Sequence, residues 1–262
     1  SLSWLQDLVQ VNEPAAELGE RLSMAGFEVE EMDDLSRLAQ GVVVGEVLER
    51  DKHPNADKLS VCKVNVGAQE PLQIVCGAKN VRAGIHVPVA MVGAVLPAVN
   101  LTIKAGDLRG VSSQGMICSL SELGQPSDVD GIAILEDLLD SPPAPGVPVA
   151  PLLGLDDTVI ELAITANRPD GLSMIGIARE VAALTGASLQ LPPASAPAGI
   201  HQLSPNAGSE TAMKRGGVYA LTDVRGIDGA RTSPEWLRQR LQRAGVNPVN
   251  AVVDITNLVM LE

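Results

Sequence analysis

The sequence has very few aromatic residues: of its 262 residues, one is Phe, one is Tyr and two are Trp. None of these lies between residues 40 and 120. The core must therefore be built from aliphatic side chains, since aromatic rings otherwise contribute the largest buried areas. Residues 40–120 also lack the rings on which bases stack in single-strand-binding proteins. Any nucleic acid bound there should be held through its phosphate backbone, weakly and in a salt-sensitive way.

Cysteine is scarce as well, and positions 62, 76 and 118 show no paired spacing. This pattern argues against a disulfide framework and against a zinc ribbon. A zinc site formed by His53 with the three cysteines has no ligand spacing behind it, so we expect no metal and three buried apolar thiols. The sequence shows no run of 18 apolar residues, no signal peptide, no P-loop and no GxGxxG motif. We therefore expect a cytoplasmic protein without a membrane span.

The formal net charge of −13 argues against a nucleic-acid-binding protein at first sight. The charge is unevenly distributed, however, because residues 40–120 carry eight Lys and Arg against six Asp and Glu. This slightly basic stretch in an acidic chain is a weak electrostatic signal on its own.

The pattern of apolar residues and turn residues along the sequence predicts an α+β protein of several domains. Residues 40–150 hold short β-branched runs separated by Gly, Pro and Asn, a pattern typical of an oligonucleotide-binding (OB) β-barrel. Residues 1–39 and 152–190 each combine helix and strand patterns, so we expect them to form one split α/β domain into which the barrel is inserted. Residues 200–262 are expected to begin a further α/β domain.

Several element ends can be predicted from capping residues. We expect a first helix capped by Ser3, a second capped by Asn12, and a helix from about 171 to 184 that Asp170 caps and Gly186 ends. The segment "GGVYALTDV" (216–224) is predicted as a strand, a helix follows from Ser233, and "NAVVDITNLVMLE" (250–262) is predicted as a buried strand.

The stretch "HPNADKLSVCKVNVG" (53–67) combines a histidine, a proline-containing turn and an alternating strand. We interpret His53, Asn55 and Asp57 as residues that shape the loop, since Asn and Asp in turns bond their own backbone. A turn alone does not account for Lys58 and Lys63. In an OB barrel the loop after the first strand lies beside the ligand-binding face, so we expect these two lysines to contact RNA.

A second stretch, "DLRGVSSQGM" (107–116), places Arg109, Ser113 and Gln114 near two glycines. Arg109 could hold a phosphate with its planar guanidinium group, and the other two could hydrogen-bond the RNA backbone or sugar. The simpler alternative is a Gly-rich connection that carries solvated polar groups.

Together, "HPNADKL" and "LRGVSSQGM" resemble the OB domain of structure-specific tRNA-binding proteins. The segments "LQIVCGAKNVRAG", "TANRPDGLSMIGIAREVAALTG" and "NAVVDITNLVMLE" extend the resemblance to the N-terminal third of the bacterial phenylalanyl-tRNA synthetase β subunit family. The resemblance implies a tRNA-binding region that is not catalytic by itself. It also implies that residues after about 200 open the family's editing (B3/B4) domain.

For the whole enzyme, the resemblance implies a ligase that attaches phenylalanine to tRNA(Phe) using ATP and Mg²⁺, assembled with an α subunit as α2β2. No cofactor is expected within these residues. Thr256 and Asn257 match an editing-pocket segment, whereas Asn247 stands where the family usually has arginine, which argues against deacylation of mischarged tRNA. Two alternatives remain: a stand-alone tRNA-binding module, or a structural spacer without RNA contact.

Overall fold

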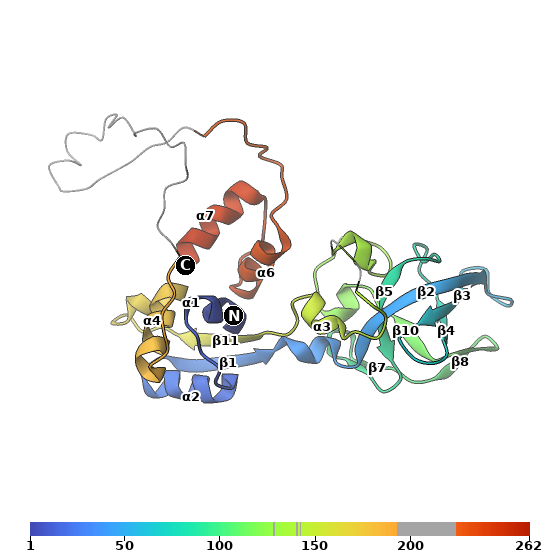
Figure 1. Ribbon diagram of the computed structural model, residues 1–262, viewed down its shortest axis with the longest axis horizontal. Helices are drawn as coiled ribbons and strands as arrows, with labels where there is room; N and C mark the ends of the chain where they lie inside the picture. The colour runs from blue at the N-terminus through green and yellow to red at the C-terminus, as the bar shows by residue number, and fades with distance from the viewer. Residues whose placement is uncertain (128, 140, 142, 193–223) are drawn as a thin grey trace. The chain divides into compact units, whose positions relative to one another are not determined.

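The computed structural model of the chain describes residues 1–127, 129–139, 141, 143–192 and 224–262 (Figure 1). These residues form two compact units, one comprising Ser3–Val29 with Leu162–Glu262, and the other comprising Glu30–Glu161. In the described part of the chain, no helix is both long and apolar enough to cross a membrane. The expected boundaries of the three domains stay a prediction.

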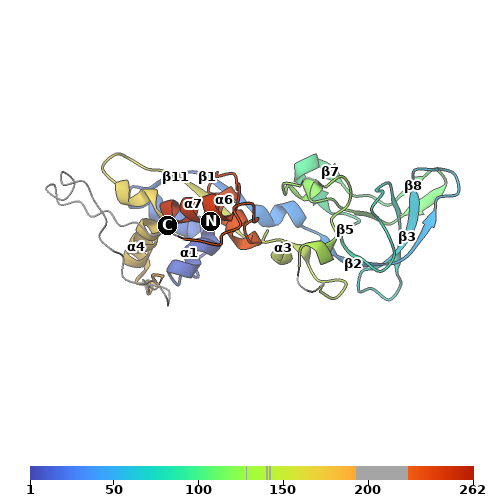
Figure 2. The ribbon, with the colours of Figure 1, turned by 90° about the horizontal axis from the view of Figure 1, so that it is seen from above.

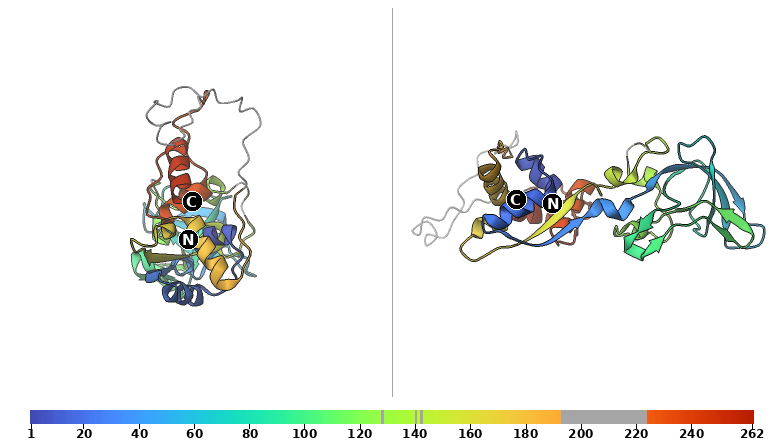
Figure 3. Two further views of the ribbon diagram at one scale, coloured as in Figure 1. Left: turned by 90° about the vertical axis from the view of Figure 1, so that its left-hand side faces the viewer. Right: turned by 90° about the horizontal axis from the view of Figure 1, so that it is seen from below.

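The chain passes between the two units within two strands, β1 (Glu28–Asp34) and β11 (Thr158–Ala163). These strands pair with each other in a two-stranded sheet, and they run side by side in the right-hand view of Figure 3. The backbone N–H of Leu35 continues the pairing by donating to the carbonyl of Asp157 at 3.0 Å. The polypeptide between these two residues is therefore an insertion whose ends are adjacent.

The insertion folds into a nearly closed antiparallel barrel, as the sequence predicts. Its five strands follow the order β10-β5-β2-β3-β4. Their bounds are β2 (Val42–Lys52), β3 (Ser60–Asn65), β4 (Leu72–Cys76), β5 (His86–Met91) and β10 (Gly115–Ile117). The first four arise from the β-branched runs of the sequence, whereas β10 directly follows the polar, Gly-rich stretch around Ser113 and Gln114.

The first half of strand β2, from Val42 to Val47, packs on both faces, which explains its nearly continuous apolar run, whereas Leu48–Lys52 is exposed. Val47 faces the barrel interior, whereas Val42 and Val44 pack into a second core outside the barrel. Gly45 is needed between them, because a Cβ there would lie 2.5 Å from a methyl group of Val89. The alternation of a strand thus serves two cores at once.

Short elements surround the sheet in the same unit (Figures 1 and 2), and η1, η3, η4 and α3 contribute buried residues to the second core. They are η1 (Leu35–Ala39), β6 (Val95–Leu96), η2 (Pro97–Val99), β7 (Leu101–Thr102), β8 (Gly106–Leu108), β9 (Val111–Ser113), η3 (Ser121–Leu123), η4 (Leu135–Asp137) and α3 (Val149–Leu152). Strands β6 and β7 form one hairpin, and β8 and β9 form another.

The other unit is mainly helical. Its elements are α1 (Leu2–Leu8), α2 (Ala15–Met24), η5 (Pro169–Leu172), α4 (Met174–Thr185), α6 (Glu235–Arg243) and α7 (Ala251–Leu261). It buries Trp4 and Phe27, two of the four aromatic residues of the chain.

The first two helices begin at residues other than the predicted caps. The side chain of Ser1, rather than that of Ser3, accepts the hydrogen bond from the backbone N–H of Trp4. Helix α2 has Pro14 at its N-cap position without a side-chain cap, so Asn12 does not cap it. In both cases a second residue suited to a helix start lies two positions away, and the sequence alone does not separate the two.

The helix predicted from 171 to 184 is divided into the short turn η5 and helix α4. The cap of α4 is Ser173, whose hydroxyl accepts from the N–H of Gly176, so the prediction of Asp170 as cap was wrong. Gly186 ends the helix in a left-handed conformation, as predicted.

The segment 250–262 is a helix, so its prediction as a strand was wrong. The side-chain oxygen of Asn250 accepts hydrogen bonds from the N–H groups of Val252 and Val253, which is a strong helix start. The predicted strand 216–224 lies, apart from its last residue, outside the described residues.

Candidate nucleic-acid interface

His53 lies at the end of β2 and is turned inward, with only 5% of its surface exposed. Its ring nitrogen Nδ1 accepts a hydrogen bond from the backbone N–H of Asn55 at 3.0 Å. The proton of the neutral ring must then sit on Nε2, which donates to the carbonyl of Leu108 at 2.9 Å. His53 thus connects the loop after β2 with the distant β8–β9 hairpin.

Asn55 makes the next connection between the same two segments. Its side-chain Nδ2 donates to the carbonyl of Arg109 at 2.9 Å. Arg109 has a φ of 54°, a left-handed conformation that is rare for residues other than glycine. The carboxylate of Asp107 accepts from the N–H of Gly110 at 2.6 Å, which fixes the turn further. We call loop 53–59 and turn 107–110 together the barrel tip.

The barrel tip presents two cations to solvent, beside the two exposed carboxylates of Asp57 and Asp107. Lys58 and Arg109 are both exposed, and neither forms an ion pair with any residue in the described part of the chain. Asp57, the third residue interpreted as loop-shaping, is exposed too. Side chains that are free to move and already solvated can neutralise phosphates with little desolvation cost.

Lys63 is in a different situation from Lys58. It lies on β3, and its Nζ is 2.7 Å from a carboxylate oxygen of Glu49 on β2. The hydrogen bond and charge of Glu49 raise the pKa of Lys63. Both side chains are about half exposed, so the pair is weak and a polyanion could compete for the lysine.

Ser113 and Gln114 join the two edges of the barrel. Ser113 is buried, and its hydroxyl accepts from the N–H of Val75 and donates to the carbonyl of Gly115, both at 3.1 Å. The backbone N–H of Gln114 donates to the carbonyl of Gln73, and its side-chain oxygen accepts from the N–H of Gln73 at 3.1 Å. These bonds give both residues a structural function at the seam between β4 and β10.

The two residues also differ in whether RNA could reach them. Ser113 is 5% exposed, which leaves its hydroxyl out of reach of a strand on the surface. Gln114 is exposed, and its amide group can still donate outward. Gln73 and Asp107 carry no signal in the sequence, since the fold alone brings Gln73 to its partner and the turn 107–110 brings Asp107 to its own.

The two residues that resemble an editing-pocket segment lie on helix α7. The hydroxyl of Thr256 is exposed and donates back to the carbonyl of Val253 at 2.6 Å. Asn257 is half-buried, and Asn247 is exposed in the segment before the helix.

The three cysteines are free and buried. Burial raises the pKa of the Cys62 thiol to about 11 and that of the Cys118 thiol to about 12. Within the described residues, no group of three or more His, Cys, Asp or Glu side chains is placed to hold a metal ion.

Comparison with known families identifies the barrel. A family model described as "Putative tRNA binding domain" matches residues 42–139, and a second, described as "B3/4 domain", matches residues 216–262. Among solved structures, the C-terminal domain of Plasmodium vivax p43 is similar at 29% identity, with a TM-score of 0.28 over 39% of this chain and 54% of that chain. The family model over residues 42–139 defines the class, a protein with an OB-like tRNA-binding domain.

Relatives along the full length of the chain are more specific. The phenylalanine–tRNA ligase beta subunit of Synechococcus sp. (strain CC9605) is 70% identical over 262 residues, which are 100% of this chain and 32% of that protein. The same subunit of Synechocystis sp. (strain ATCC 27184 / PCC 6803 / Kazusa) is 55% identical, again over 32% of its length. Along all 262 residues the chain is similar to the phenylalanine–tRNA ligase beta subunit, and it spans about a third of the length of these curated relatives.

Proposed function

We propose that the barrel binds tRNA through the phosphate groups that Lys58 and Arg109 contact at the barrel tip. The observation that supports this proposal most directly is the hydrogen-bonded connection of loop 53–59 to turn 107–110. It brings together the two segments that carry the unpaired cations, in a domain whose family is described by tRNA binding. Lys63 and Gln114 lie outside the tip and contribute as secondary contacts.

The chemistry of the tip favours backbone contacts over base readout. An arginine guanidinium group can hold two phosphate oxygens at once, and a lysine acts as a mobile point charge. The matched domain contains no aromatic residue on which bases could stack. The contribution of the tip to binding should therefore be weak, insensitive to sequence and strongly dependent on salt.

Fluorescence anisotropy of labelled tRNA(Phe) tests the proposal. Changing Lys58→Gln together with Arg109→Gln should weaken binding about tenfold and reduce the slope of log affinity against log salt by about two, one for each lost phosphate contact. Arg37→Gln is the matched control, since Arg37 is an exposed cation of the same unit on η1, outside the tip. Equal affinities and slopes for the double variant and the wild type would refute the proposal.

In its enzyme, we propose that this region is a non-catalytic accessory part of a cytoplasmic ligase that joins phenylalanine to tRNA(Phe). ATP and Mg²⁺ would then be used elsewhere in an α2β2 assembly with the α subunit. The support for this is the identity to beta subunits along all 262 residues. Charge reversal at Lys58 and Arg109 in the reconstituted enzyme should raise the KM for tRNA. Unchanged aminoacylation kinetics would favour a structural spacer instead.

Deacylation of mischarged tRNA is the second candidate, because the B3/4 family model covers Thr256 and Asn257. Asn247 in place of the usual arginine argues against it. Incubating the chain with tyrosyl-tRNA(Phe) decides the matter, since measurable hydrolysis above the spontaneous rate would establish an editing activity.

A further inference from the structure

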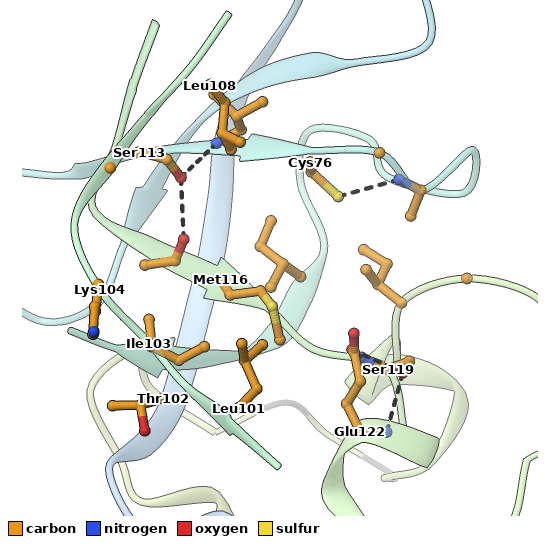
Figure 4. Close-up of a pocket in the computed structure, with 18 of the residues that line it drawn as sticks. Cys76, Leu101, Thr102, Ile103, Lys104, Leu108, Ser113, Met116, Ser119 and Glu122 are labelled. Carbon is orange, nitrogen blue, oxygen red and sulfur yellow. Dashed lines mark hydrogen bonds between the residues drawn. The ribbon is translucent and has the colours of Figure 1, made fainter. Parts of the chain in front are cut away.

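A groove of about 600 Å³ lies beside the seam between β4 and β10, in the same unit as the barrel tip (Figure 4). It exists because β4 and β10 are not paired as neighbours in the sheet and are joined at one end by Ser113. The apolar side chains that line it come from the strands β4, β7, β8 and β10 and from the residues next to them. They include Cys76, Leu101, Ile103, Leu108, Met116 and Ile117, and Ile132 adds an apolar side chain from outside these strands.

The apolar lining is suited to a flat ring. Leu101 and Ile103 lie side by side in Figure 4, with Met116 next to them. The thioether of methionine is polarisable and makes favourable contacts with π-systems. The volume is within the range of pockets that enclose small ligands. In a domain without aromatic side chains, this is a place where an unstacked base could be packed.

Glu122 supplies a polar group at one side of the groove. Its Oε2 accepts from the N–H and the hydroxyl of Ser119, at 2.6 and 2.8 Å. Its Oε1 accepts no hydrogen bond from any residue in the described ranges. A carboxylate repels phosphate and accepts from N–H groups, so the groove is suited to the base of a nucleotide rather than to its phosphate.

Cations flank the groove where the backbone of the same nucleotide would lie. Lys104 lines its edge, and Leu108 is followed directly by Arg109 of the barrel tip. A nucleotide with its base in the groove would thus place its phosphate near positive charge. Proteins commonly recognise RNA through bases that are turned out of a loop or end in this way.

We propose that the groove takes one unstacked nucleotide of the bound RNA, with its base packed on Met116 and its N–H edge directed at Glu122. This inference rests on the proposed tRNA binding and specifies the feature that is bound. Guanine should be preferred, because its N1–H and its amino group present two adjacent donors to a carboxylate. Uracil should be least preferred, because its single N3–H lies between two carbonyl groups that the carboxylate repels.

The Met116 methyl group reports on the groove directly. In the 262-residue chain with ¹³C-labelled methionine methyl groups, the Met116 resonance is assigned by its loss in Met116→Leu. Titration with GMP should shift it saturably in the millimolar range, and UMP should shift it at least threefold less at the same concentration. Titration with tRNA(Phe) should shift the same resonance.

Two variants and a matched control complete the experiment. Leu101→Trp fills the groove, so it should remove the GMP shift and weaken tRNA binding about fivefold, at the lower end of what one packed base contributes. Val99→Trp places the same side chain at an exposed position of η2 that does not line the groove, and should change neither. Glu122→Gln keeps an acceptor for Ser119 and should remove the preference for GMP over UMP.

The outcomes separate this inference from the proposed function. No shift of Met116 with any mononucleotide or with tRNA overturns the inference, as does an unchanged GMP shift in Leu101→Trp. A shift with the extended peptide acetyl-Val-Thr-Val-amide but not with nucleotides would assign the groove to a protein partner and overturn it too. If Lys58→Gln with Arg109→Gln leaves tRNA affinity unchanged, the proposed function fails, and the GMP titration still tests the groove by itself.

Discussion

Replacing Ser113 by alanine separates a structural function of this residue from contact with RNA. The hydroxyl of Ser113 satisfies the N–H of Val75 and the carbonyl of Gly115, and all three groups are at the barrel seam. Alanine leaves the amide of Val75 without its partner in a buried position. A buried donor left unsatisfied costs about 1–3 kcal/mol. We therefore expect Ser113→Ala to destabilise the seam by about 2 kcal/mol.

Hydrogen exchange of the Val75 amide measures this effect at the site where it occurs. A loss of about 2 kcal/mol corresponds to about 30-fold faster exchange if the amide exchanges through local opening. Tryptophan fluorescence would not detect the change, because Trp4 and Trp236 both belong to the other unit. The affinity for tRNA, measured at a temperature where the variant is folded, should stay within twofold of the wild type.

Ser112→Ala is the control, because Ser112 is the exposed neighbour on the same strand and contributes its backbone carbonyl, not its hydroxyl, to Gln73. It should leave exchange at Val75 unchanged. The reasoning would be refuted by unchanged exchange at Val75 in Ser113→Ala together with a large loss of tRNA affinity. That result would show that the hydroxyl serves RNA and not the seam.

Three other expectations follow from groups in the barrel unit. Gly45→Ala should destabilise the barrel by about 2–3 kcal/mol, because the new methyl group would lie 2.5 Å from a methyl group of Val89. Urea unfolding followed by circular dichroism measures this loss, and a loss below about 0.5 kcal/mol would contradict the prediction. Burial raises the pKa of Cys118 to about 12, so mass spectrometry should find it unmodified by iodoacetamide at pH 8 in the native protein and modified in urea; rapid native modification would show that the thiol is accessible. Burial raises the pKa of Glu136, but hydrogen bonds from the side chain and backbone of His86 outweigh it and leave that pKa below 4.5. The stabilisation is then present above pH 4.5 and lost as the pH falls through the lowered pKa of Glu136. The difference in stability between the wild type and Glu136→Gln should therefore shrink in acid. A difference that stays constant with pH would show that protonation of Glu136 is not coupled to folding.

The barrel could be predicted because its strands carry their own signal. The apolar runs of β2, β3, β4 and β5 are rich in Val and Ile and are separated by turn residues. Strand β10 has only three residues, and one of them is glycine, so its strand character comes from pairing with β5 rather than from its composition. Ser113 and Gln114 were interpreted by chemical type, and their structural partners lie about 40 positions away in sequence.

Helix α7 shows how a local signal can be overlooked. Its Val- and Ile-rich composition is typical of a strand, yet Asn250 is a strong helix cap directly before it. The cap outweighs the strand propensity of the apolar run that follows it. The positive φ of Arg109 could not be predicted at all, since no property of arginine favours it and the bonds from Asn55 and Asp107 impose the turn.

The adjacency of Leu35 and Asp157 has a consequence for how this domain can be inherited or engineered. The inserted segment begins after Leu35 and ends before Asp157, and these two residues share a hydrogen bond. A short linker could therefore replace the residues between them without distorting the rest of the protein. Conversely, the barrel could be inserted into another protein wherever two neighbouring strands end as close together as Leu35 and Asp157 do here. Gain, loss or transfer of the whole RNA-binding module would then require only two junctions.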